Sequence, residues 1–93
     1  MAIRLIVTMK AKPGQGRAYA EAYRPSMMAT QSEPGCEQYE LFQSTLNPDV
    51  FVLIERWTDQ KALDEHMVIL GRRDNREIVA LREAEPVREV YEA

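Results

Sequence analysis

The sequence predicts an α+β fold with a four-stranded antiparallel sheet, and three observations lead to this prediction. Four segments carry the alternating or β-branched patterns that are typical of strands. Two segments between them have the apolar spacing of amphipathic helices. Proline and glycine residues separate these segments. A length of 93 residues suits a single domain, which we assign to residues 1–93.

The first strand and the first helix follow from a change of period near residue 13. Residues 2–11 alternate, so that one face of a strand carries Ile3, Leu5, Val7 and Met9. Residues 15–32 instead have helical spacing, with an apolar stripe that contains Ala20, Tyr23 and Met27. Pro25 lies inside this helix and lacks a backbone donor, which predicts a kink or a break there.

A hairpin is predicted next. Residues 36–45 read as a strand with Tyr39 and Leu41 on one face. The Asn-Pro-Asp sequence at residues 47–49 is typical of a turn. Residues 50–58 are β-branched and aromatic on both faces, which is typical of a central strand.

The last third of the chain predicts a helix, a second helical stretch and a final strand. Thr58 or Asp59 is a suitable N-cap for the helix. Gly71 is expected to end it. Its expected apolar stripe is Ala62, Leu63, Met67 and Leu70. A further helical stretch is expected over residues 72–84, and residues 87–91 alternate as a strand.

The resulting order of elements is β-α-β-β-α-β. Right-handed crossovers then place both helices on one face of the sheet, which is the ferredoxin-like arrangement. The other face has no cover within the chain, yet it carries apolar residues such as Ile6, Ile54 and Tyr91. Because a large exposed apolar surface marks an interaction site, we predict a homodimer that pairs through its sheet faces into a closed barrel. The alternative is a monomer with a few exposed apolar side chains.

Composition narrows the range of partners and compartments. The net charge is only −3 with both signs interspersed, so we expect no nucleic-acid partner. No stretch is apolar for long enough to suggest a membrane span, and no signal peptide is expected. The single cysteine, Cys36, cannot form an internal disulfide, which fits a cytoplasmic location. One histidine and one cysteine do not form a ligand cluster, so no metal is expected.

A family resemblance appears in the segments PGCEQYELFQS and NPDVFVLIERWTDQKALDEHM. They resemble the antibiotic biosynthesis monooxygenase family of dimeric α+β barrels, as does the opening strand followed by Lys-Pro-Gly at residues 12–14. The matching features are Pro34-Gly35-Cys36, Tyr39, Phe51, the Glu55-x-Trp57 pair and the Ala62-Leu63-x-x-His66 spacing. The resemblance implies the barrel fold. Family members include quinol monooxygenases, polyketide-modifying oxygenases, haem-degrading enzymes and an isomerase of autoinducer phosphates.

Haem degradation is disfavoured by the same resemblance. The haem-degrading members use a histidine after the second helix, a tryptophan near position 66 and an asparagine on the first strand. Residues 71–76 contain no histidine, His66 stands where the tryptophan would be, and the first strand has no asparagine. We therefore expect no cofactor.

Cofactor-free oxygenation needs a base, an apolar pocket and a donor that stabilises the substrate anion. His66 is the predicted catalytic base, because an unperturbed histidine has a pKa of about 6.5. The alternative is a structural histidine bonded to Glu55 or to a backbone carbonyl. We predict that the substrate contacts Tyr39, Glu55, Trp57, Tyr91 and Met27, each of which has a structural alternative as a packing or bracing residue.

The leading functional hypothesis is a cofactor-independent monooxygenase that oxidises a small planar aromatic or quinol substrate in the pocket of a dimeric barrel. The first alternative is a barrel that binds a small ligand or serves in assembly without catalysis. An isomerase of a small phosphorylated metabolite ranks below both. Many family members have a second histidine about five residues after His66, where this chain has Gly71.

Overall fold

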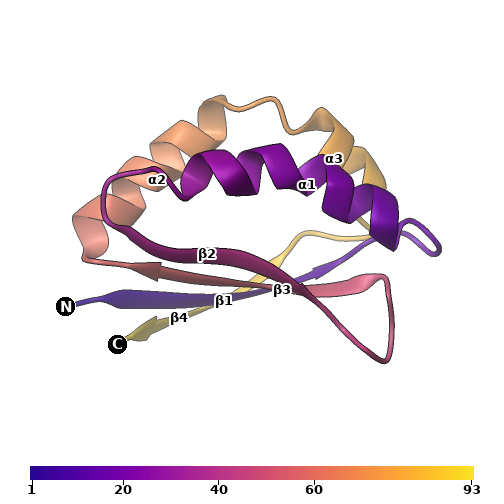
Figure 1. The fold of residues 1–93 in the computed structure, drawn as a ribbon, viewed down its shortest axis with the longest axis horizontal. Helices are drawn as coiled ribbons and strands as arrows, with labels where there is room; N and C mark the ends of the chain where they lie inside the picture. The colour runs from indigo at the N-terminus through magenta and orange to yellow at the C-terminus, as the bar shows by residue number, and fades with distance from the viewer.

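The computed structural model describes residues 1–93. Four strands and three helices follow one another along the chain (Figure 1): β1 Ile3–Lys10, α1 Gly16–Thr30, β2 Cys36–Gln43, β3 Val50–Trp57, α2 Gln60–Arg72, α3 Arg76–Leu81 and β4 Val87–Glu92. None of the helices combines the length and hydropathy that are needed to cross a membrane.

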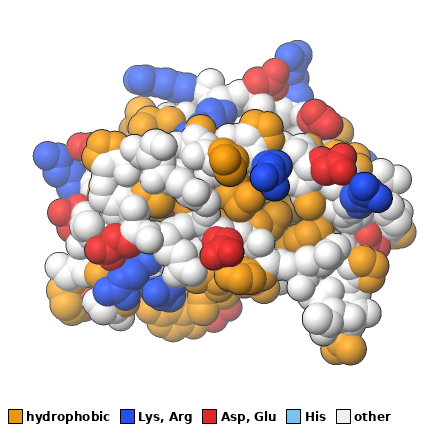
Figure 2. All heavy atoms as spheres, viewed as in Figure 1, with side chains coloured by type: hydrophobic (Ala, Val, Ile, Leu, Met, Phe, Trp, Pro, Cys, Tyr) orange, Lys and Arg blue, Asp and Glu red, His pale blue; other side chains and the backbone are white.

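The strands form one antiparallel sheet in the order β2-β3-β1-β4. All three helices lie on the same side of this sheet, and the other side has no covering element (Figure 1). This arrangement confirms the predicted ferredoxin-like α+β fold. The space-filling view from the same direction shows Lys and Arg side chains scattered among Asp and Glu side chains rather than gathered by sign (Figure 2).

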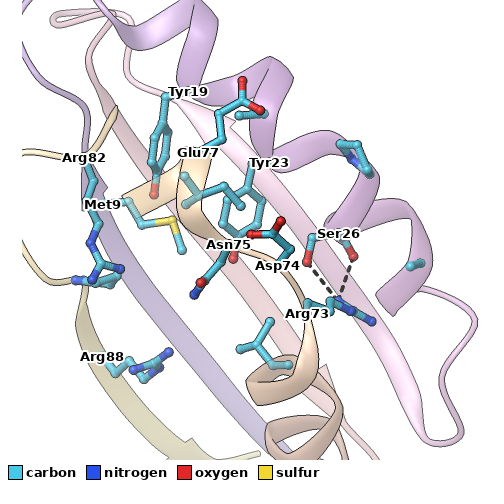
Figure 3. A pocket seen from close by; sticks show the side chains of 16 residues that line it. Met9, Tyr19, Tyr23, Ser26, Arg73, Asp74, Asn75, Glu77, Arg82 and Arg88 are labelled. Atoms are coloured by element: carbon cyan, nitrogen blue, oxygen red, sulfur yellow. Dashed lines mark hydrogen bonds between the residues drawn. The ribbon is translucent and has the colours of Figure 1, made fainter. Parts of the chain in front are cut away.

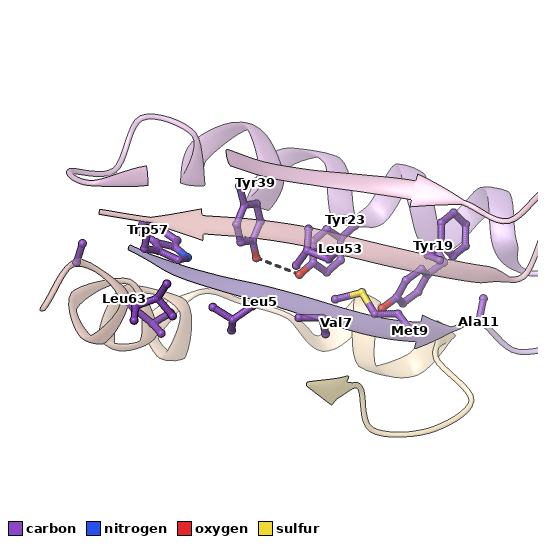
Figure 4. Packing of buried hydrophobic residues seen from close by; sticks show 13 residues of the cluster. Leu5, Val7, Met9, Ala11, Tyr19, Tyr23, Tyr39, Leu53, Trp57 and Leu63 are labelled. Atoms are coloured by element: carbon purple, nitrogen blue, oxygen red, sulfur yellow. Dashed lines mark hydrogen bonds between the residues drawn. The ribbon is translucent and has the colours of Figure 1, made fainter. Parts of the chain in front are cut away.

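The strand alternation places the core between the helices and the sheet. The odd-numbered residues of β1 and β3 are buried under the helices, whereas most of the even-numbered ones are half-buried on the uncovered side. Aromatic rings from α1, β2 and β3 fill much of this layer (Figure 4). The β1–β4 register sets Arg88 opposite the buried Val7 and Tyr91 opposite Arg4, so the two β4 side chains lie on opposite faces.

Helix α1 continues through the exposed Pro25, so the break that was one of the two predicted outcomes does not occur. One prediction about α2 was wrong. Gly71 does not end α2, which runs to Arg72.

The predicted N-cap and apolar stripe of α2 are partly confirmed. Asp59 is the N-cap and accepts a hydrogen bond from the Ala62 N–H at 2.9 Å. Met67 is 42% exposed, and His66 takes the buried position instead. His66 lies four residues after Ala62 and three after Leu63, so it shares their face of the helix. A helix is present within the stretch predicted over residues 72–84, but it is shorter than predicted and forms α3.

A side chain at Gly35 is expected to destabilise the fold. Its φ is +79°, and an added Cβ would lie 2.5 Å from the Ala62 Cβ and 2.7 Å from the Thr58 Oγ1. Gly14 has the same backbone conformation, with φ of +78°, but open space around it. Replacing Gly35 with alanine should therefore lower the free energy of unfolding by about 1–3 kcal/mol more than the Gly14→Ala change. Urea unfolding of both variants measures this difference, and equal losses would contradict the packing argument.

Candidate functional site

A pocket with a volume of about 440 Å³ lies between α1, α3 and the helix-facing side of the sheet (Figure 3). Its apolar wall includes Tyr19 and Tyr23 from α1, Met9 from β1 and Ile78 from α3. Three arginine side chains also line it: Arg73 after α2, Arg82 after α3 and Arg88 from β4. An apolar wall with a few convergent polar groups is typical of a site for a small organic ligand.

The two tyrosines stand side by side because α1 presents them four residues apart on its buried face. Their ring centroids are 6.0 Å apart, and Tyr19 also packs on Phe51 at 5.6 Å. Burial raises the pKa of Tyr19 to about 12 and also raises the pKa of Tyr23. Both phenols are therefore protonated near neutral pH, where they can donate hydrogen bonds but do not act as bases.

Arg73 is held firmly at the pocket wall. Its Nη1 donates to the Ser26 carbonyl at 3.1 Å, the Ser26 Oγ at 2.9 Å and the Thr30 Oγ1 at 2.7 Å. Its Nη2 donates to a carboxylate oxygen of Glu33 at 2.7 Å. These bonds join the α2–α3 connection to the last turn of α1, so the guanidinium stays in place without a ligand (Figure 3).

Glu33 connects Arg73 to His66 behind this wall. Its second carboxylate oxygen lies 2.9 Å from the His66 Nδ1, and its side chain is only 8% exposed. The His66 ring packs on Trp57 at a centroid distance of 4.6 Å and meets the Tyr39 ring edge-on at 5.3 Å. The histidine is thus an inner member of a buried polar cluster that reaches the pocket through Arg73.

A second connection runs through the tyrosines. The hydroxyl groups of Tyr23 and Tyr39 are hydrogen-bonded at 3.2 Å, as the dashed line in Figure 4 shows. Tyr23 lines the pocket, and Tyr39 contacts His66. The pocket wall and the buried cluster are therefore joined at two points.

Glu55 is the buried carboxyl of this cluster. Trp57 Nε1 donates a hydrogen bond to its Oε1 at 3.0 Å. Burial raises the pKa of Glu55 above its usual 4.5, although the Trp57 hydrogen bond and the neighbouring His66 and Arg88 side chains act in the opposite direction. The carboxyl consequently keeps its proton to a higher pH than an exposed glutamate.

This raised pKa predicts how stability depends on pH. Above pH 4.5 the unfolded state has lost a proton that folded Glu55 still holds, so this group lowers stability as the pH rises through its folded pKa. The Glu55→Gln change keeps an oxygen for Trp57 and removes the titration. The stability of the variant relative to wild type should therefore rise with pH above 4.5 and then level off.

Urea unfolding across this pH range measures the effect. The matched control is Glu65→Gln on the exposed side of α2, where the relative stability should show no such rise. A flat difference for Glu55→Gln would contradict the burial of an ionisable group at this position.

The predicted site residues divide into three places. His66, Tyr39, Glu55 and Trp57 come together between α2 and the sheet. Met27 is half-buried against the core. Tyr91 lies on the uncovered face, where its hydroxyl donates to Glu89. None of these residues lines the pocket.

Tyr19 and the three arginines line the pocket but were not among the predicted site residues. One pattern could have revealed Arg88. In the strand sequence VREVY, an arginine occupies the same alternate positions as Val90, opposite the apolar face of β1. Arg73 and Arg82 follow helices and have no periodic pattern that marks them. No group of three or more His, Cys, Asp or Glu side chains is arranged to hold a metal ion.

Comparison with known proteins finds a matching protein family. The family model for antibiotic biosynthesis monooxygenase matches residues 2–68. Bacillus subtilis (strain 168) has a protein named "Putative monooxygenase YcnE", which is 28% identical over 58 residues, covering 62% of this chain and 61% of YcnE. The chain thus matches about three fifths of the length of this relative.

Solved structures agree along nearly the whole chain. PA3566 from Pseudomonas aeruginosa is 29% identical with a TM-score of 0.80, covering 97% of this chain and 91% of that one. A crystal structure of an antibiotic biosynthesis monooxygenase is 28% identical with a TM-score of 0.80, covering 98% and 97%. With most of its length matched by the family model, the chain belongs to the antibiotic biosynthesis monooxygenase family.

Proposed function

We propose that this protein is a cofactor-independent monooxygenase that oxidises a small planar aromatic or quinol substrate in the pocket between the helices and the sheet. The observation that carries the proposal is the pairing of an apolar, aromatic wall with three arginines in one cavity of about 440 Å³. Such a cavity can hold a ring and stabilise the negative charge that forms when the ring loses a proton.

The proposed reaction balances without an external reductant. The quinol binds as an anion that has given its proton to solvent; this anion gives an electron to O₂, and recombination forms a carbon–oxygen bond at a ring carbon. Cleavage of the O–O bond then leaves one oxygen on the ring and releases the other as water. A benzene diol thus becomes a hydroxyquinone, and the substrate supplies all four electrons. In this scheme the pocket binds the ring, lowers the pKa of its hydroxyl through nearby cations and excludes bulk water.

We assign His66 a positioning role within this proposal. It contacts Glu33 and not the pocket, and Glu33 in turn holds Arg73 at the pocket wall. A His66 N–H that donates to Glu33 fixes one carboxylate oxygen and leaves the other for the guanidinium. His66 would therefore act on the substrate through Arg73 rather than by taking its proton.

Oxygen uptake with a panel of quinols tests both parts. Wild type should consume O₂ with at least one quinol, and His66→Ala should be slower. His66→Gln should recover part of the rate, because its amide N–H can still donate to Glu33. A complete lack of uptake, or equal rates in wild type and His66→Ala, would contradict the proposal. If Gln performs no better than Ala while both variants fold, His66 has another role.

The uncovered face of the sheet supports a homodimer that pairs through its sheets. Ile6, Val52 and Ile54 lie at its centre, with Phe42 and Tyr91 each nearly half exposed beside them. A second copy would remove this apolar area from water. Light scattering after size exclusion should give twice the 10.7 kDa mass of the chain at micromolar concentration. A monomer would contradict the proposal.

Ligand binding without turnover is the second candidate. It is favoured by one observation: the pocket lining contains no histidine, and its two tyrosines are protonated near neutral pH. The uptake experiment separates the two, since a binding protein would take up a ring compound without consuming O₂.

A further inference from the structure

Arg88 lies on the helix-facing side of β4, an edge strand whose residues are all exposed. It pairs with Val7, which is 1% exposed, and it therefore points from β4 toward the helices. Its side chain is exposed, so the charge stays in contact with water at the open side of the pocket. Arg88 lines the pocket, and in Figure 3 it lies on the β4 side, below Tyr19 and Tyr23 in this view.

Arg88 is the one pocket arginine that takes part in none of the eight salt bridges. Arg73 is neutralised by the buried Glu33. Arg82 pairs with Glu85 at 3.2 Å, but the Glu85 side chain is 89% exposed, so this pair is weak. Arg88 therefore has no ion-pair partner on the β4 side of the pocket, although its charge reaches the buried Glu55 and lowers the pKa of that carboxyl against the effect of burial.

The two acids in the pocket lining do not supply the missing charge. Asp74 binds Arg76 through both carboxylate oxygens, and Arg76 does not line the cavity. The carboxylate of Glu77 points away from Arg88 (Figure 3). The positive charge also reaches the phenols, because Arg88 and Arg73 act to lower the pKa of Tyr23 against the effect of burial.

We propose that the pocket is specific for planar aromatic acids, whose ionised carboxylate binds Arg88 while the ring packs against Tyr19 and Tyr23. The planar guanidinium can bind both oxygens of a carboxylate at once. Arg82, on the same side of the cavity, adds a second positive charge. This inference rests on the proposed function in one respect, which is the choice of this pocket as the substrate site.

Calorimetric titration of the full chain with a matched pair of ligands tests the proposal. The probe is 2-hydroxybenzoate, and its neutral counterpart is 2-hydroxybenzamide, which has the same ring and hydroxyl. Wild type should bind the acid at least about tenfold more tightly than the amide. Arg88→Gln should weaken acid binding by about 10- to 100-fold and leave amide binding unchanged. Arg88→Lys keeps the positive charge but loses the planar group that can bind both carboxylate oxygens. Its affinity for the acid should lie between those of wild type and Arg88→Gln.

Arg17→Gln is the control for lost charge, because the Arg17 side chain is 93% exposed on α1 and away from the pocket. It should bind both ligands as wild type does. Equal affinities of wild type for acid and amide, or no acid binding at about 1 mM, would overturn the proposal. So would an unchanged preference in a folded Arg88→Gln variant.

Two further comparisons complete the test. The first asks whether binding requires the ring as well as the anion, and the second distinguishes failure of the proposed ligand class from failure of the proposed reaction. Acetate and inorganic phosphate should compete poorly, and strong competition by either would overturn the requirement for a ring. An Arg88-dependent preference for the acid supports the ligand class even if no quinol is oxidised, in which case the oxygenase proposal fails alone. Oxidation of neutral quinols without any preference for the acid gives the reverse outcome.

Discussion

Replacing Glu33 with alanine is expected to lower the free energy of unfolding by about 3–5 kcal/mol. The Glu33 carboxylate is 8% exposed and binds His66 through one oxygen and Arg73 through the other. Alanine would leave a guanidinium charge and an imidazole nitrogen without their partner in a region of low polarity. Removing one partner of a buried ion pair is costly for this reason, even where the intact pair contributes little net stability.

The control for this prediction is Glu37→Ala. Glu37 pairs with Arg56 at 2.8 Å, but the two side chains are 42% and 35% exposed, so we expect a loss of at most about 1 kcal/mol. Glu33→Gln should fall between the two alanine variants, since its amide oxygen can still accept one bond. Denaturant unfolding measures all three. Similar losses in the free energy of unfolding for Glu33→Ala and Glu37→Ala would contradict the prediction that the buried cluster stabilises the fold more than an exposed ion pair does.

Trp57→Ala is expected to cost a comparable amount, about 3–5 kcal/mol. Trp57 is 0% exposed and is the largest of the fully buried side chains. Its ring packs on His66, and its Nε1 is the hydrogen-bond donor to Glu55. Alanine would therefore leave a large cavity and an unpartnered carboxyl in the same place.

Trp57→Phe separates these two effects. Phenylalanine keeps much of the ring volume but has no N–H for Glu55, so we expect a smaller loss of about 1–3 kcal/mol. Unfolding should be followed by far-ultraviolet circular dichroism, because Trp57 is the only tryptophan and its fluorescence disappears with it. If the phenylalanine variant is as unstable as the alanine variant, the hydrogen bond to Glu55 matters more than packing.

Much of the fold was predictable because local patterns and global packing agree. The alternation Ile3, Leu5, Val7 and Met9 marked the buried face of β1, and the structure buries all four. Errors arose where tertiary context outweighed a local rule. Helix α1 continues through Pro25, which is exposed, and Met67 is apolar yet stands one residue past the buried face of α2.

The candidate site was less predictable because its parts come from distant segments. Glu33, His66 and Arg73 come from three different parts of the chain, and no spacing in the sequence predicts that they are in contact. The pocket between α1 and α3 depends on how far a short helix stands above the sheet, which periodicity does not determine. His66 was therefore predictable as a notable residue, whereas the pocket that its neighbours support was not.

We propose that oxidation takes place in this pocket rather than on the uncovered face of the sheet. The most direct test compares oxygen uptake by Ala29→Trp and Ala80→Trp with an accepted quinol. Both alanines are exposed on helices, but only Ala29 lines the pocket, where an indole would fill the space for a ring. We predict that Ala29→Trp loses most of the uptake and that Ala80→Trp retains it. Equal rates in Ala29→Trp and wild type, with both folded, would contradict the claim.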